Sequence, residues 1–135
     1  MIRYLDSAES VSAAQLQGFF VGWPNPPSPD THLQILRESQ HRVLALDETT
    51  DQVVGFVTAI SDGVLSAYIP LLEVVPSAQG QGIGKELVQR MLRKLESLYM
   101  VDLLCDASIQ PFYEALGLQK AQGMMIRNYP RQNGE

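Results

Sequence analysis

A glycine-rich turn between an apolar strand and a long amphipathic helix is the feature that most constrains this chain. Residues 65–75 are apolar enough for a central strand, and residues 82–99 repeat apolar side chains at helical spacing. Between them stands the stretch Gln79-Gly80-Gln81-Gly82-Ile83-Gly84. Glycines allow close approach to the backbone, and the free N–H groups of a first helical turn attract anions. The turn therefore predicts a site for a phosphate-bearing ligand.

Two common phosphate-binding loops do not fit this stretch. A Walker loop that ends in Gly84-Lys85 requires Ser or Thr next, where the chain has Glu86. A dinucleotide fingerprint that starts at Gly80 requires glycine where Lys85 stands, and one that starts two residues later fails at Leu87. The sequence therefore disfavours an NTPase and a Rossmann-type dinucleotide site.

The rest of the sequence predicts an α/β domain with a mixed, mostly antiparallel sheet flanked by helices. Apolar periodicity predicts strands over residues 2–5, 42–47, 52–60, 65–75, 101–105 and 123–127, and helices over residues 7–20, 29–38, 82–99 and 109–116. Four prolines predict a stiff loop over residues 22–29, where Ser28 caps the next helix. We expect one domain over residues 1–130 and a disordered tail over residues 131–135.

Composition narrows the class of partner and the compartment. The net charge is -5 and no block of basic residues occurs, which disfavours nucleic acid. The single cysteine, Cys105, fits a reducing compartment and reads as a buried inert thiol. No signal peptide or membrane-length apolar run is evident, so we expect a cytoplasmic protein without a membrane partner. His32 and His41 lack partners at ligand spacing, so we expect surface histidines and no metal.

Two motifs together resemble one known family. The pattern Q/R-x-x-G-x-G/A is met by Gln79, Gly82 and Gly84, and residues 111–118 read Pro-Phe-Tyr-Glu-Ala-Leu-Gly-Leu. The second stretch is similar to an F-Y-E-x-L-G-F element, with Leu118 in place of the last Phe. Both motifs, and the order of predicted elements, resemble the GNAT superfamily of CoA-dependent N-acyltransferases. The resemblance covers nearly the whole chain.

The resemblance implies acetyl-CoA as co-substrate and an amine, either a small molecule or a peptide, as acceptor. It assigns cofactor contacts to Val74, Val75, Gln79, Gly80, Gln81, Gly82, Ile83, Gly84 and Lys85. For Lys85 the alternative is a solvated side chain, which is the more common role of a lysine at a helix start. The resemblance makes Tyr113 the general acid toward the CoA thiolate, and the alternative is a tyrosine packed on its helix.

The amine attacks the thioester directly in such enzymes, and a base or a water relay helps to deprotonate it. Glu73 is the leading candidate for the base, and the alternative is a carboxylate that faces solvent or pairs with a neighbour. The predicted acceptor-binding residues are Trp23, Asp62, Tyr68 and Asp106. Trp23 reads equally as a lid over the core.

Two other functions stay open at this point. A non-catalytic acyl-CoA-binding or regulatory module would keep the glycine turn without turnover. An interaction protein would use the glycines only to pack a helix closely on a sheet, with no cofactor. Exposed edge strands also make a homodimer an expectation.

Overall fold

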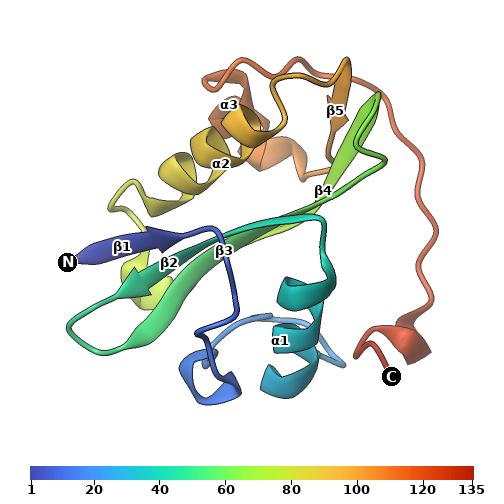
Figure 1. Ribbon diagram of the computed structural model, residues 1–135. Helices are drawn as coiled ribbons and strands as arrows, with labels where there is room; N and C mark the ends of the chain where they lie inside the picture. The colour runs from blue at the N-terminus through green and yellow to red at the C-terminus, as the bar shows by residue number, and fades with distance from the viewer.

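Five strands lie side by side in chain order in the computed structural model, which describes residues 1–135 (Figure 1). They are β1 (Ile2–Leu5), β2 (His41–Asp47), β3 (Gln52–Ser61), β4 (Ser66–Val74) and β5 (Met100–Asp102). The first four strands pair antiparallel, and β5 runs parallel to β4. The predicted mixed, mostly antiparallel sheet is confirmed.

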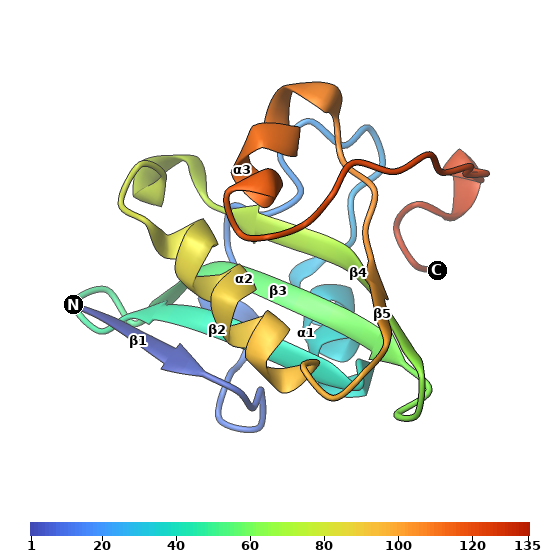
Figure 2. The same cartoon turned by 90° about the horizontal axis from the view of Figure 1, so that it is seen from above.

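Helices cover both faces of this sheet (Figures 1 and 2). The long helix α2 (Ile83–Lys94) lies on one face across β2, β3 and β4, and α1 (Pro29–Glu38) lies on the other. The short helix α3 (Gln110–Glu114) follows β5. Four single 3-10 turns complete the structure: η1 (Ala13–Gln15), η2 (Pro76–Ala78), η3 (Ala107–Ile109) and η4 (Tyr129–Arg131). No helix has the length and apolarity needed to span a bilayer.

Alternation along β2 divides the core into two layers. Val43 and Ala45 pack under α2, while Leu44 and Leu46 pack on the α1 face. At Gly55 the helix approaches the sheet so closely that an added Cβ would lie 3.0 Å from Leu87 Cδ1. This close packing fixes the position of the first turns of α2, where the phosphate site is predicted.

The sheet splits open beside β4. Its pairing with β5 covers only residues 66–68, so residues 69–74 have no neighbour on that side. A bulge lies at the point of divergence, because Thr58 pairs with Leu71 but Ile60 pairs with Tyr68. The extra residue on β4 lies next to Pro70, whose missing N–H suits an interrupted ladder. The bulge and the split therefore leave a free strand edge inside the molecule.

Several predicted elements are confirmed with small shifts of their ends, but one predicted helix is absent. Residues 7–20 form only η1, followed by Gly18 at φ 87°, Phe20 at φ 60° and Gly22 at φ 82°. Left-handed residues cannot continue an α-helix. The apolar residues of this segment are nonetheless buried on the α1 face. Their spacing therefore indicated which residues are buried, but it did not indicate a helix.

The C-terminal third also departs from prediction. The strand expected at 101–105 is shorter and half-exposed, and residues 123–127 pair with no strand. The reason is the split, which carries the chain after Asp102 away from β4. Residues 131–135 continue from η4, and the Gln132 side chain accepts a hydrogen bond from the Asn25 N–H at 2.8 Å. The expected disordered tail is therefore a docked turn.

Candidate active site

The glycine turn forms a cradle of free N–H groups at the start of α2. None of the N–H groups of residues 80–85 donates to another atom of the protein. Gly80 and Gly82 have φ values of 81° and 82°, a conformation that other residues adopt only with strain. An added Cβ at either glycine would meet nothing within 4 Å, so the cradle is open to solvent. Such a concave set of N–H groups at a helix start suits a phosphate or pyrophosphate.

The free edge of β4 lies next to this cradle. Val75 donates its N–H to Val54 O at 2.9 Å, so alternation directs the backbone groups of Val74 and Leu72 toward the open side. The Gln79 side chain confirms this direction, since its Nε2 donates to Val74 O at 3.0 Å. The edge therefore offers hydrogen-bonding groups to an extended ligand that runs on from the cradle.

Helix α3 places Tyr113 on the far side of the same opening. Its neighbour Phe112 approaches the start of α2, because an added Cβ on Gly84 would lie 3.8 Å from Phe112 Cζ. Burial raises the pKa of Tyr113 to about 12, with a smaller contribution from the nearby Cys105. The phenol is thus protonated throughout the physiological range. Cys105 itself is half-buried.

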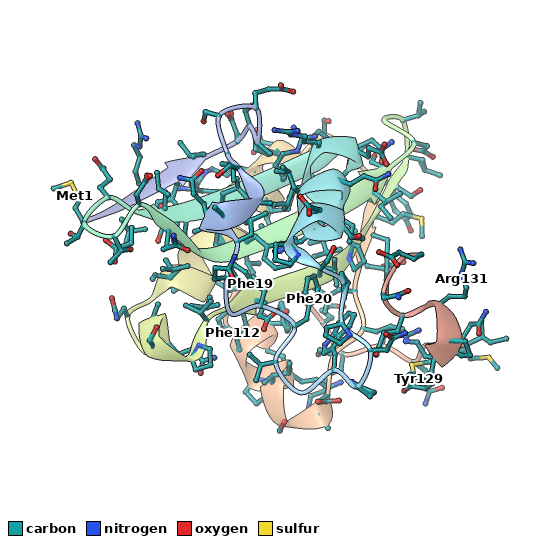
Figure 3. All side chains as sticks on the ribbon, turned by 90° about the horizontal axis from the view of Figure 1, so that it is seen from below. Met1, Phe19, Phe20, Phe112, Tyr129 and Arg131 are labelled. Carbon is teal, nitrogen blue, oxygen red and sulfur yellow. The ribbon has the colours of Figure 1, made fainter.

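Glu73 points to the opposite face of β4 and holds a loop. Its carboxylate oxygens accept hydrogen bonds from the Phe20 N–H at 2.7 Å and the Val21 N–H at 3.2 Å. These bonds fix the left-handed conformation of Phe20 and turn its ring toward Trp23, with ring centroids 4.8 Å apart. Trp23 is 37% exposed and packs on the Phe20 ring, so it lies at the surface of the loop that Glu73 holds. Figure 3 shows Phe19 and Phe20 on this face of the molecule.

His32 is buried beneath this loop, against the expectation of a surface histidine. It is 1% exposed and is surrounded by the rings of Phe19, Phe20 and Phe56, at centroid distances of 5.1, 4.9 and 4.4 Å. Desolvation lowers its pKa to about 4, so the ring is neutral at physiological pH. Its Nε2 has no hydrogen-bond partner. His32 therefore acts as part of the aromatic packing that supports the loop.

Of the other predicted residues, only Tyr68 lies near Tyr113, whereas Asp62 is engaged in a turn and Asp106 and Lys85 are exposed. Tyr68 lines a hollow together with Tyr113, near the split in the sheet. Asp62 instead lies in the β3–β4 turn, where its carboxylate accepts the N–H groups of Val64 and Leu65 at 2.8 Å each. These bonds lower the pKa of Asp62 to about 2 and give it a turn-forming role. Asp106 is exposed at the start of η3, and Lys85 is exposed with no ion pair.

Comparison with known proteins identifies the arrangement. The sequence profile of the acetyltransferase (GNAT) family matches residues 8–118, which include the cradle, the β4 edge, Glu73 and Tyr113. The chain belongs to the GNAT acetyltransferase family. Acetyl transfer is the general reaction of that family, and its members use acetyl-CoA.

Solved GNAT structures share the whole architecture. A crystal structure of a proposed acetyltransferase from Deinococcus radiodurans R1 is 50% identical, with a TM-score of 0.94, and the match covers 98% of this chain and 92% of that one. A GNAT family acetyltransferase from Streptococcus pneumoniae is 31% identical with a TM-score of 0.75, and the match covers 95% and 98% of the two chains.

Curated GNAT relatives include longer proteins. The chloroplastic GCN5-related N-acetyltransferase 3 of Arabidopsis thaliana is 43% identical over 74 residues, which are 53% of this chain and 31% of that protein. The chloroplastic GCN5-related N-acetyltransferase 2 is 27% identical over 84% of this chain and 52% of its own length. The chain thus spans about a third to a half of these two relatives.

The GNAT site fits acetyl-CoA on grounds independent of the family match. Six consecutive N–H groups without partners suit the pyrophosphate, and the free β4 edge at Leu72 and Val74 suits the amide-bearing arm. A buried neutral phenol at Tyr113 suits a thiolate leaving group.

Sequence reasoning missed the residues that shape the loop. Phe20, His32 and Gln132 contribute through contacts that span the chain, and no local motif marks them. One signal was available: two glycines flank Phe19 and Phe20 at positions 18 and 22, which argues against a helix there. The partners of Glu73 had no sequence signal at all.

Proposed function

We propose that this chain transfers the acetyl group of acetyl-CoA to a primary amine, by direct attack of the amine in a ternary complex. The observation that carries the proposal is the row of six free N–H groups from Gly80 to Lys85, placed where β4 loses its neighbour. When bound there, acetyl-CoA supplies an activated thioester. The chain's own residues then bind, orient and move protons.

The cofactor contacts divide between the cradle and the strand edge. Backbone N–H groups at Gly80, Gly82 and Gly84 bind the pyrophosphate, and the edge at Val74 binds the pantetheine amides. The Gln79 side chain, now bonded to Val74 O, is released when that edge takes a ligand. Lys85 contributes only charge, because its side chain is exposed and forms no ion pair.

Tyr113 is the proposed proton donor to the departing sulfur. A phenol with a pKa of about 12 always presents an O–H to the thiolate. Outright transfer to a thiol of pKa about 8.5 would be uphill by about 5 kcal/mol, at 1.36 kcal/mol per unit. Tyr113 therefore passes on the proton that the attacking nitrogen loses, receiving one as it gives one. The N–C bond forms as the thioester C–S bond breaks, the amine N–H bond breaks, and its proton passes through Tyr113 to the departing sulfur.

Glu73 is the proposed base, either directly or through one water. Its two hydrogen bonds to the loop leave a further lone-pair position on each oxygen, which suffices for an ammonium or a water. The same carboxylate also positions Phe20 and Trp23. An acceptor with a cationic amine and apolar bulk matches this combination of negative charge and aromatic wall. Asp62 is too engaged in its turn to share this role.

The test is release of the CoA thiol from acetyl-CoA over a panel of polyamines, arylalkylamines, amino acids and peptides. Gly82→Asp is the site variant, because a carboxylate in the cradle repels the pyrophosphate. Gly63→Asp is the matched control, since Gly63 also has a positive φ of 75° and open space for a side chain. We expect acetyl-CoA affinity to fall at least about tenfold, or about 1.4 kcal/mol, in the first variant only.

The outcomes separate the three functions considered. Acceptor-dependent release that Gly82→Asp abolishes supports the transferase and identifies its substrate class. Binding of acetyl-CoA without release for any amine would favour the non-catalytic module. Absence of acetyl-CoA binding in the wild type would favour an interaction protein and overturn the proposal. We also propose a cytoplasmic location, to be checked by fractionation.

A further inference from the structure

A groove of about 510 Å³ lies between the last turns of α2 and the segment that follows β1. Figure 2 shows the end of α2 beside this segment. The helix separates Gly82 from Arg93 by about 16 Å at 1.5 Å per residue, so the groove is distinct from the cradle at the start of α2. We call it the basic groove, and its charged and hydroxyl-bearing lining consists of Asp6, Ser7, Ser10, Arg90, Arg93 and Lys94.

Positive charge is concentrated in the basic groove although the chain as a whole is acidic. Three basic residues and one acidic residue line it, while the chain has a net charge of -5. Arg90, Arg93 and Lys94 are spaced i, i+3 and i+4, so they lie on one face of α2, where like charges repel one another. The helix dipole stabilises cations in the last turn, but its partial charge of about one half is smaller than the three charges gathered there. An anion in the groove would relieve this repulsion.

Arg90 is held in a fixed orientation on the floor of the groove. Its Nε donates to Glu86 Oε1 at 2.9 Å, and its guanidinium carbon lies 4.6 Å from the centroid of the Tyr4 ring. These contacts use the Nε–H and one face of the guanidinium, and neither Nη atom donates to another atom of the protein. A guanidinium fork that is already oriented loses little conformational entropy when it binds an anion.

The other donors of the groove are also free. Arg93 is exposed and forms no ion pair, and Lys94 contacts only Asp6, at 3.4 Å. An ammonium group has three N–H donors, so two of those on Lys94 remain without a partner. The backbone N–H groups of Ser7 and Ser10 donate to no atom of the protein. The groove thus combines three cations with neutral donors on the facing segment.

We propose that the basic groove binds a phosphate group, either as the free ion or as the monoester of a small molecule. A phosphate dianion has several acceptor oxygens, which match the planar fork of Arg90, the free guanidinium of Arg93 and the ammonium of Lys94. Serine hydroxyl and backbone N–H groups complete the set of donors, as they do in other phosphate sites. A volume of about 510 Å³ also has room for the organic part of a monoester. The inference does not depend on acetyl transfer.

Two-dimensional NMR of the full 15.0 kDa chain tests this proposal. The probes are inorganic phosphate, glucose 6-phosphate, adenosine monophosphate and succinate, each titrated at an ionic strength held constant with NaCl. We expect saturable shifts of the Ser7 and Ser10 amides and of the Arg90 Nε–H, with a Kd of about 1 mM or tighter for at least one phosphate probe. Shifts of residues 80–85 report the cradle separately, so a failure of the proposed acetyl-CoA site is distinguishable from a failure of the groove.

Two variants separate a built site from diffuse charge. Arg90→Lys keeps the charge but loses the fork, and Arg93→Gln removes a guanidinium that has no partner in the protein. Both should weaken binding of the best phosphate probe at least about fivefold. Arg3→Gln is the matched control, because it removes the same charge on β1 at a position that pairs with Leu46 and therefore faces the α1 side of the sheet. Its affinity should stay within about twofold of the wild type.

The outcomes either identify the ligand or overturn the proposal. A monoester that binds more tightly than inorganic phosphate identifies a sugar phosphate or a nucleotide as the class of ligand, and the reverse order identifies the free ion. Shifts in the groove that never saturate, or succinate binding as tight as that of every phosphate probe, overturn the proposal. An affinity that Arg90→Lys leaves unchanged and that Arg3→Gln lowers as much as Arg93→Gln shows diffuse charge only, and overturns it as well. Near-UV circular dichroism should match the wild type for all three variants, because their side chains are at least partly exposed.

Discussion

The burial of His32 predicts a specific loss of stability in mild acid. Its ring is 1% exposed among three phenylalanines, and its pKa falls from 6.5 to about 4. The unfolded chain binds a proton at this residue below about pH 6.5, whereas the folded chain does not until about pH 4. The contribution of His32 to the free energy of unfolding is therefore fully present above pH 6.5, and it is lost as the pH falls toward 4.

The shift sets the magnitude of that loss. The pKa of His32 is about 2.5 lower in the folded chain than in the unfolded chain. At 1.36 kcal/mol per pKa unit, this difference corresponds to about 3 kcal/mol of folding free energy. At pH 5, where the folded ring is still neutral, the linkage relation gives a loss of about 2 kcal/mol relative to pH 7. That is a large share of the stability of a domain of this size.

The assay compares the wild type with His32→Phe in urea at pH 7 and pH 5. Trp23 is the only tryptophan and lies 4.8 Å from the Phe20 ring, so its fluorescence reports unfolding of the loop above His32. Any cost of fitting the larger phenylalanine ring is the same at pH 7 and pH 5, so it cancels when the two pH values are compared. The titration of the carboxylates and of His41 is the same in both proteins, so it cancels when the variant is compared with the wild type. We compare the free energy of unfolding of His32→Phe with that of the wild type at each pH. Between pH 7 and pH 5, we expect this difference to change by about 2 kcal/mol in favour of His32→Phe.

A gap that stays constant between the two pH values would refute this reasoning. It would mean that the buried ring is hydrated or hydrogen-bonded strongly enough to keep an ordinary pKa. Both proteins are measured at one concentration, so that self-association contributes equally.

Three further substitutions test the site and its support. Tyr113→Phe should lower kcat at least about tenfold with little change in acetyl-CoA affinity, and unchanged turnover in steady-state assays would rule out the donor role. Glu73→Gln removes one acceptor for the Phe20 and Val21 N–H groups, so Trp23 anisotropy should fall and acceptor KM should rise. If only the pH–rate profile changes, Glu73 acts as a base without holding the loop. Gly55→Ala should destabilise the fold by about 1–3 kcal/mol in urea titrations, because Leu87 and Ile83 must move; a neutral effect would show that α2 shifts freely.

The cradle of free N–H groups was predictable because its physics is local. The spacing of Gln79, Gly82 and Gly84 fixes the turn, the helix start and the free N–H groups within six residues. The hairpin of β2 and β3 and the capped start of α1 follow from equally short signals. At Ser28 the predicted cap is confirmed, since its hydroxyl accepts the Thr31 N–H at 3.1 Å.

The parts that could not be predicted depend on distant contacts. Apolar residues at helical spacing over residues 7–20 looked like an amphipathic helix, but the same residues bury equally well in an irregular segment that the sheet supports. Residues 123–127 have strand composition, yet a strand also needs a neighbour. The split at β4 removes that neighbour within the single chain.

The two halves of the site therefore differ in how the sequence encodes them. One continuous segment builds the cradle, so a substitution there acts directly on the proposed acetyl-CoA site. The loop that carries Phe20 and Trp23 is instead held by residues far away in the sequence. Glu73 bonds Phe20 from 53 residues away, Gln132 bonds Asn25 from 107 residues away, and His32 packs beneath the Phe20 ring. Changes in any of these supports can reshape the proposed acceptor wall around Trp23 while leaving the cradle intact. A fold arranged in this way can keep one cofactor and vary its acceptor, which is why the sequence reveals the first more readily than the second.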